Sequence, residues 1–84
     1  MKNQQALAAL AMDLRRAALG YHRGSLGMAK RFWIEALKRR EEIDMDLLKP
    51  YVRRCLMKLD DNNRVDAEDM LMYSILFQNA AVVY

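Results

Sequence analysis

Apolar residues recur at intervals of three and four along most of this 84-residue chain, and this spacing limits its fold more than any other feature. Side chains three and four residues apart lie on one face of an α-helix, so the spacing predicts amphipathic helices. Residues that break helices are scarce, because the chain contains one proline and three glycines. No stretch alternates with the period of two that is typical of a strand. The sequence therefore predicts an all-α fold.

We expect one domain over residues 1–84, folded as a compact four-helix bundle of two antiparallel helical hairpins. The predicted helices span about 4–22, 26–42, 47–59 and 67–81. The link between the first two helices is very short, which favours antiparallel packing. One apolar stripe from each helix is expected to form the core, which would contain Leu10, Leu14, Ala29, Trp33, Leu37, Val52, Leu56, Met70, Leu71 and Ile75.

Residues typical of helix ends occur near each predicted boundary. Asn3, Ser25 and Asp66 are good N-caps for the first, second and fourth helices. Gly24 suits the left-handed conformation that often follows a helix. Pro50 falls in the first turn of the third helix, where its missing N–H costs little. These residues support the predicted helix boundaries.

The first two helices resemble one hairpin of the tetratricopeptide family over about residues 10–43. The resemblance rests on the spacing Gly24, Leu26, Ala29, Trp33, Ala36, Leu37. Arg16 and Gly20 depart from the family pattern, and Glu41 stands where its proline is expected. No second copy occurs, and such repeats need about three units to form a stable stack. The resemblance implies peptide or protein binding, but we treat the segment as a generic antiparallel helix pair.

Charge is divided unequally along the chain. Residues 1–40 carry a net charge of +7, and residues 41–84 carry −4. Three interpretations remain open. The acidic half neutralises the basic half within the monomer, or the basic half binds an acidic protein or another copy, or it binds nucleic acid.

The nucleic-acid interpretation has two forms. The second and third helices are compatible with a helix-turn-helix that presents Arg53, Arg54 and Lys58. Alternatively, the basic and aromatic residues near Tyr21 and His22 bind an RNA backbone and stack a base. Acidic residues flank the third helix and would repel phosphates, which disfavours the first form.

The sequence offers little for catalysis or metal binding. Cys55 is the only cysteine and His22 the only histidine, and they lie in different predicted segments. A lone cysteine at a core position is typical of a reducing compartment, so we expect a cytoplasmic protein. No apolar run approaches the roughly 18–20 residues that span a bilayer. We expect no enzyme activity, no cofactor, no metal, no small-molecule substrate and no membrane partner.

We therefore predict a small adaptor or regulatory protein that binds another protein. The marginal core of so short a chain and its seven methionines also predict a homodimer. A nucleic-acid-binding regulator is the alternative. In either case binding is expected on the basic hairpin, through Arg15, Arg16, Tyr21, His22, Arg23, Lys30, Arg31, Lys38, Arg39 and Arg40.

Overall fold

A computed structural model describes residues 2–60 and 65–83 of the chain, and these residues form four α-helices and one 3₁₀ turn. The elements in order are α1 (Lys2–His22), α2 (Leu26–Glu41), the turn η1 (Met45–Leu47), α3 (Pro50–Met57) and α4 (Ala67–Val83). The described residues include no strand. The predicted all-α bundle is confirmed.

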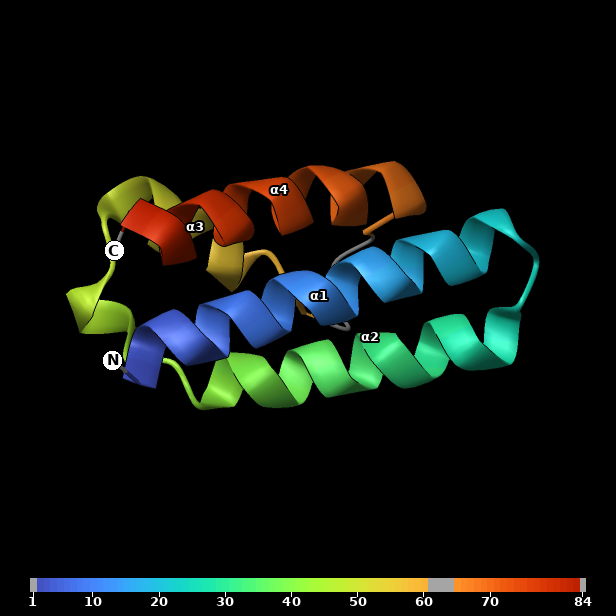
Figure 1. The fold of residues 1–84 in the computed structure, drawn as a ribbon, viewed down its shortest axis with the longest axis horizontal. Coiled ribbons are helices and arrows are strands. Elements are labelled where there is room, and N and C mark those ends of the chain that lie inside the picture. Colours follow the sequence, from blue (N-terminus) through green and yellow to red (C-terminus); the bar gives the residue numbers. More distant parts are fainter. Residues whose placement is uncertain (1, 61–64, 84) are drawn as a thin grey trace.

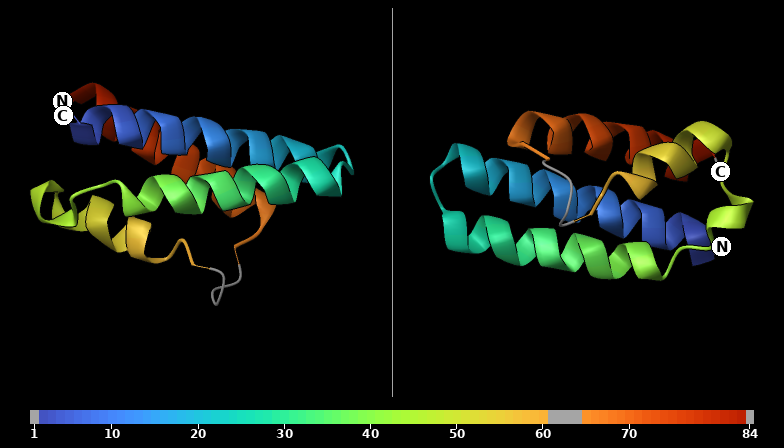
Figure 2. Two further views of the ribbon diagram at one scale, coloured as in Figure 1. Left: turned by 90° about the horizontal axis from the view of Figure 1, so that it is seen from below. Right: turned by 180° about the vertical axis from the view of Figure 1, so that it is seen from behind.

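Helix α1 is the centre of the bundle, because both α2 and α4 pack along it. The two neighbours run antiparallel to α1, so the N- and C-terminal ends lie at one end of the molecule and the α1–α2 turn at the other (Figure 1). The short α3 lies behind this layer, near the termini (Figure 2). Helix α4 packs mainly on α1 and only weakly on α3, since the eight residues of α3 offer little surface.

The helix ends follow local chemistry. Gly24 adopts a left-handed φ of 76°, which lets the chain reverse after α1. Asp66 caps α4, because its carboxylate accepts the backbone N–H of Asp69 at 2.8 Å. Lys49 has extended backbone angles, as a residue before proline prefers, so α3 starts at Pro50 and is shorter than predicted.

Asn3 is not the N-cap that the sequence predicts. Helix α1 already begins at Lys2, and the side chain of Asn3 is buried with 4% of its surface exposed. Its amide nitrogen donates to the Asp44 carbonyl at 2.9 Å, and its amide oxygen accepts the Asp44 N–H at 2.9 Å. This two-point pairing fixes the segment between α2 and η1 against the start of α1.

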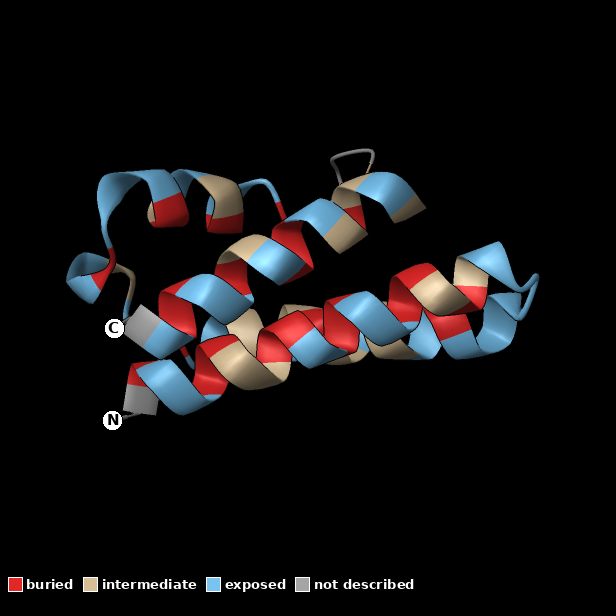
Figure 3. Ribbon diagram, turned by 45° about the horizontal axis from the view of Figure 1, so that its top comes forward, coloured by how far each residue is buried: buried red, intermediate tan, exposed pale blue. Residues whose placement is uncertain are grey.

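Figure 3 shows how burial is distributed over the helices. Most of the predicted core members are buried or pack against the core. Those that are buried are Leu10, Leu14, Ala29, Val52, Leu56 and Met70, and those that pack partly buried against the core are Trp33, Leu37 and Leu71. The prediction for Ile75 is wrong, because 60% of its surface is exposed. Phe77 is fully buried instead. Helix α4 is apolar on nearly every side, so the spacing of its apolar residues does not determine which face turns inward.

The α1–α2 contact is unusually close at Gly20. A Cβ atom at this position would lie 3.0 Å from both the Cα and the Cβ of Ala29. The absence of a side chain therefore lets the two helix backbones approach each other just before the turn.

Candidate protein-binding surface

The predicted basic surface divides into two groups of residues in the structure. Four of the ten residues predicted to bind a partner are engaged by other groups of the same chain. They are Arg16, Lys38, Arg39 and Arg40. The structure thus gives part of the basic hairpin an intramolecular role.

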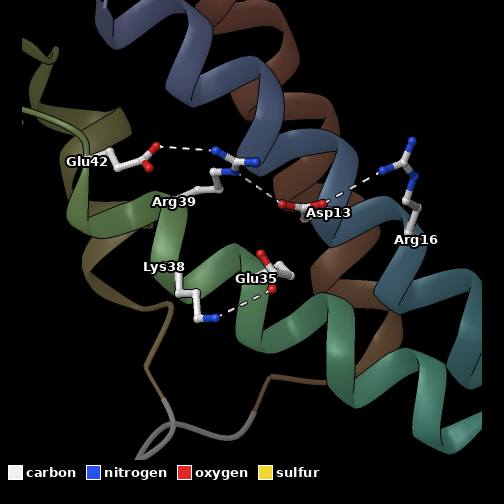
Figure 4. Close-up of polar contacts among 6 residues, drawn as sticks. All are labelled: Asp13, Arg16, Glu35, Lys38, Arg39 and Glu42. Carbon is white, nitrogen blue, oxygen red and sulfur yellow. Dashed lines mark ion pairs between the residues drawn. The ribbon is translucent and has the colours of Figure 1, made fainter.

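Two residues of the first group, Arg39 and Arg16, pair with Asp13 of α1 (Figure 4). Its carboxylate lies 3.8 Å from Nε of Arg39 on α2 and 3.9 Å from a guanidinium nitrogen of Arg16, one turn further along α1. Arg39 also lies 3.6 Å from the carboxylate of Glu42. The Arg16 guanidinium sits over the Phe32 ring, 5.5 Å from its centroid. The Arg39–Asp13 ion pair and the Arg16–Phe32 contact thus connect α1 to α2.

The environment of Asp13 disfavours its charged form. Burial raises the pKa of this carboxyl above its ordinary value of 3.8, and the positive charges of Arg39 and Arg16 only partly oppose that shift. The Nε atom of Arg39 is itself buried and forms no hydrogen bond within the described residues. The separations of 3.8 and 3.9 Å explain why the two cations do not fully compensate for burial.

Arg40 joins the end of α2 to the segment after α3. Its guanidinium donates to the backbone carbonyl of Leu59, whose side chain is fully buried. A second guanidinium nitrogen lies 3.1 Å from the carboxylate of the neighbouring Glu41. Arg40 therefore satisfies a backbone acceptor beside the core.

The second group consists of residues with no such engagement. His22 is exposed, and so are four cations that form no ion pair within the described part of the chain, namely Arg15, Arg23, Lys30 and Arg31. Tyr21 is half-buried and packs against the core. Residues 14–34 contain no aspartate or glutamate, so the turn end of the hairpin is purely basic.

Helix α4 does not neutralise this basic end through ion pairs. Its acidic residues Glu68 and Asp69 lie in its first turn, where negative charge favours the helix dipole. Within the described ranges, neither residue pairs with a cation of α1 or α2. The carboxylates that do pair belong to the α1–α2 hairpin and the residue that follows it.

A shallow apolar groove of about 410 Å³ runs between α1 and α4. Helix α1 contributes Met12, Arg15 and Leu19 to its walls, and α4 contributes Leu71, Ile75 and Gln78 among others. No residue of α2 or α3 lines it. Helix α2 packs on the side of α1 away from α4, and α3 lies behind this layer (Figures 1 and 2). We call this surface the α1–α4 groove.

The α1–α4 groove exists because α4 carries more apolar surface than one core can bury. The helix has no charged residue from Met70 to its end. Met70 and Phe77 turn inward, while Met72, Ile75 and Val82 are each more than half exposed. These three apolar side chains stand beside the exposed polar residues Gln78 and Asn79, so the exposed side of α4 is uncharged and holds more apolar surface than is usual for a solvated helix face.

The sequence predicts binding on the basic hairpin and does not identify the α1–α4 groove. A signal was available in the uncharged run from Met70, which extends over four helical turns. The predicted core takes only one stripe of this run, formed by Met70, Leu71 and Ile75. Of the residues predicted to bind a partner, only Arg15 lines the groove.

Metal-binding clusters and membrane-spanning helices are absent from the described residues. The described residues contain no group of three histidine, cysteine, aspartate or glutamate side chains placed to hold a metal ion. Cys55 is half-buried on α3. No helix among the described residues is both long enough and apolar enough to cross a membrane. Comparison with protein-family models, curated proteins and solved structures finds no match to this chain.

Proposed function

We propose that this protein acts by binding another protein through the α1–α4 groove, as a small adaptor or regulatory protein without enzymatic activity. The observation that carries the proposal is the exposed, uncharged side of α4. Ile75 has 60% of its surface exposed in the groove, beside the apolar Leu71 and the uncharged polar residues Ser74, Gln78 and Asn79. Protein interfaces are built on such contiguous apolar surfaces, and methionines such as Met12 adapt to varied partners.

Affinity capture with matched variants tests the proposal. The tagged protein is incubated in extract of its source cells as the wild type, as Ile75→Glu and as Ile34→Glu. Ile34 is a matched control, because it is 52% exposed on α2 and lies outside the groove. We expect proteins that the wild type and Ile34→Glu retain but Ile75→Glu loses. Equal retention by all three would contradict the proposal.

Self-association stays a prediction of the sequence. Light scattering across micromolar concentrations checks it, and a mass that stays at 9.8 kDa would exclude a homodimer in that range. The same measurement on Ile75→Glu tells whether any dimer uses the α1–α4 groove.

Nucleic-acid binding is a second candidate, and the purely basic turn end of the α1–α2 hairpin favours it. Arg23, Lys30 and Arg31 are exposed there without an ion pair in the described part of the chain. A gel shift on mixed RNA and DNA at about 50 mM salt tests this function, since phosphate contacts are strongest at low salt. No shift, or a shift that survives replacement of all three cations by glutamate, would exclude this mode of binding.

A further inference from the structure

We propose that the partner of the α1–α4 groove is an amphipathic helix whose apolar side is flanked by carboxylates. This inference rests on the proposed function and names the chemistry of the occupant. It follows from the shape of the groove, from the single charge in its walls and from the symmetry of a possible dimer.

The shape of the groove suits a helix. Met12, Arg15 and Leu19 follow one another at spacings of three and four on α1, and Leu71, Ile75 and Gln78 do the same on α4. Two antiparallel helices with such facing rows leave a channel that a third helix fills with residues at i, i+3 or i+4, and i+7. The α1 part of the wall, residues 11–19, has a rise of about 12 Å, which is slightly more than two helical turns.

The charge of the groove decides what flanks the apolar side of that helix. Arg15 is the only charged residue among those that line the groove. It is exposed and forms no ion pair within the described residues, in contrast to Arg16, which pairs with Asp13. An occupant with a carboxylate at this position gains an ion pair, whereas one with an ammonium group meets a like charge.

A second copy of this chain does not supply that carboxylate through the same face. A two-fold dimer pairs a surface with itself, so each groove would face the other. The residues that line the groove include Arg15 and no aspartate or glutamate. Such a dimer would therefore bring two arginines into one interface without a carboxylate from its walls.

Two synthetic peptides serve as probes. Both are covalently stapled helices of about three to four turns with leucines at i, i+3, i+7 and i+10. One carries glutamates beside the leucines, and the other carries lysines at the same positions. Binding of each fluorescently labelled peptide is measured by anisotropy at low salt. The proteins compared are the wild type, Arg15→Glu, Ile75→Glu and, as a control, Arg31→Glu. Arg31 is exposed, lies outside the groove and forms no ion pair within the described residues.

We expect the glutamate peptide to bind the wild type about tenfold more tightly than the lysine peptide, because attraction is exchanged for repulsion at Arg15. Arg15→Glu should abolish or reverse this preference, and Ile75→Glu should weaken both peptides. Arg31→Glu should leave the preference unchanged. Circular dichroism is used to check that each variant remains helical.

Other results separate the inference from the proposed function. Equal binding of both peptides, or a preference that survives Arg15→Glu, would contradict the inference that the occupant is an acidic amphipathic helix. A homodimer that depends on Ile75 would also contradict this inference. The proposed function, protein binding through the groove, would still hold. If neither peptide binds but capture from extract depends on Ile75, only the inference fails. If neither peptide binds and no captured protein depends on Ile75, both fail.

Discussion

The pairing of Asn3 with Asp44 leads to a prediction that separates two roles for one residue. If Asn3 were an N-cap, Asn3→Asp would be tolerated, because aspartate caps helices as well as asparagine does. In the structure, the amide nitrogen of Asn3 donates to the Asp44 carbonyl while its oxygen accepts the Asp44 N–H. A carboxylate keeps the second hydrogen bond but places an oxygen opposite the carbonyl.

The expected loss follows from these contacts. Each of the two hydrogen bonds is 2.9 Å long, and the Asn3 side chain is buried. Asn3→Ala removes both and should lower the free energy of unfolding by about 2 kcal/mol, at about 1 kcal/mol for each bond. Asn3→Asp loses one hydrogen bond and buries a negative charge. It should therefore lower the free energy of unfolding by about 2–3 kcal/mol at pH 7. For a chain of this size, 2 kcal/mol lowers Tm by about 10 °C.

Urea unfolding followed by circular dichroism measures these differences. Gln4→Glu is the matched control, since it makes the same amide-to-carboxylate change at an exposed position one residue away, and we expect no loss. Protonation restores a donor to the introduced aspartate, so the deficit of Asn3→Asp should shrink as the pH falls from 7 to 3. An Asn3→Asp protein as stable as the wild type at pH 7 would refute the pairing.

Three further predictions concern packing and charge. Gly20→Val should lower the free energy of unfolding by about 1–3 kcal/mol in urea, because its side chain overlaps α2 at a 3.0 Å contact. Phe77→Ala should cost about 3–5 kcal/mol in the same assay, because Phe77 is fully buried. The Asp13 carboxyl should titrate above pH 3.8 by NMR, and Arg39→Gln should raise its pKa further by removing a nearby positive charge.

Each of these predictions has a control. Gly27→Val should be nearly neutral, since nothing lies within 4 Å of its Cβ position. Ile75→Ala should lower the free energy of unfolding far less than Phe77→Ala does. Equal losses would contradict the finding that Phe77 faces inward and Ile75 outward on α4. Lys38→Gln should not move the pKa of Asp13, because Lys38 does not contribute to its shift.

The sign of the Asp13 effect follows from its raised pKa. A carboxyl that binds its proton more tightly in the folded state stabilises the fold as the pH falls through the interval between its folded-state pKa and 3.8. Above that interval the charged form is a net cost of folding. A titration midpoint at or below pH 3.8 would contradict the dominance of burial over the two arginines.

Local chemistry made much of the fold predictable from the sequence. Gly24 and Asp66 mark their helix boundaries through a backbone conformation and a hydrogen bond that involve only near neighbours, whereas α3 begins at Pro50 and not at about residue 47 as predicted. Asn3 was misread because its partner, Asp44, lies 41 residues away. A capping preference and a distant hydrogen bond call for the same residue type, so local pattern alone does not distinguish them.

The candidate site was harder to predict, because it depends on a surplus of apolar surface. Periodicity identifies the buried face of a helix only when the opposite face is polar. In α4 the inward Phe77 and the outward Ile75 are both apolar, so the sequence carried no preference for either. The basic residues were visible in the sequence, but contacts such as that of Arg40 with the Leu59 carbonyl depend on the packed chain.

The most direct test of the central claim is photo-cross-linking from single positions of the intact protein in its source-cell extract. A photoreactive amino acid replaces Ile75 in one variant and Ile34 in another, two isoleucines of similar exposure on different faces. We predict discrete protein adducts from position 75 and only background from position 34. Equal yields from both positions, or adducts from position 34 alone, would contradict the assignment of binding to the α1–α4 groove.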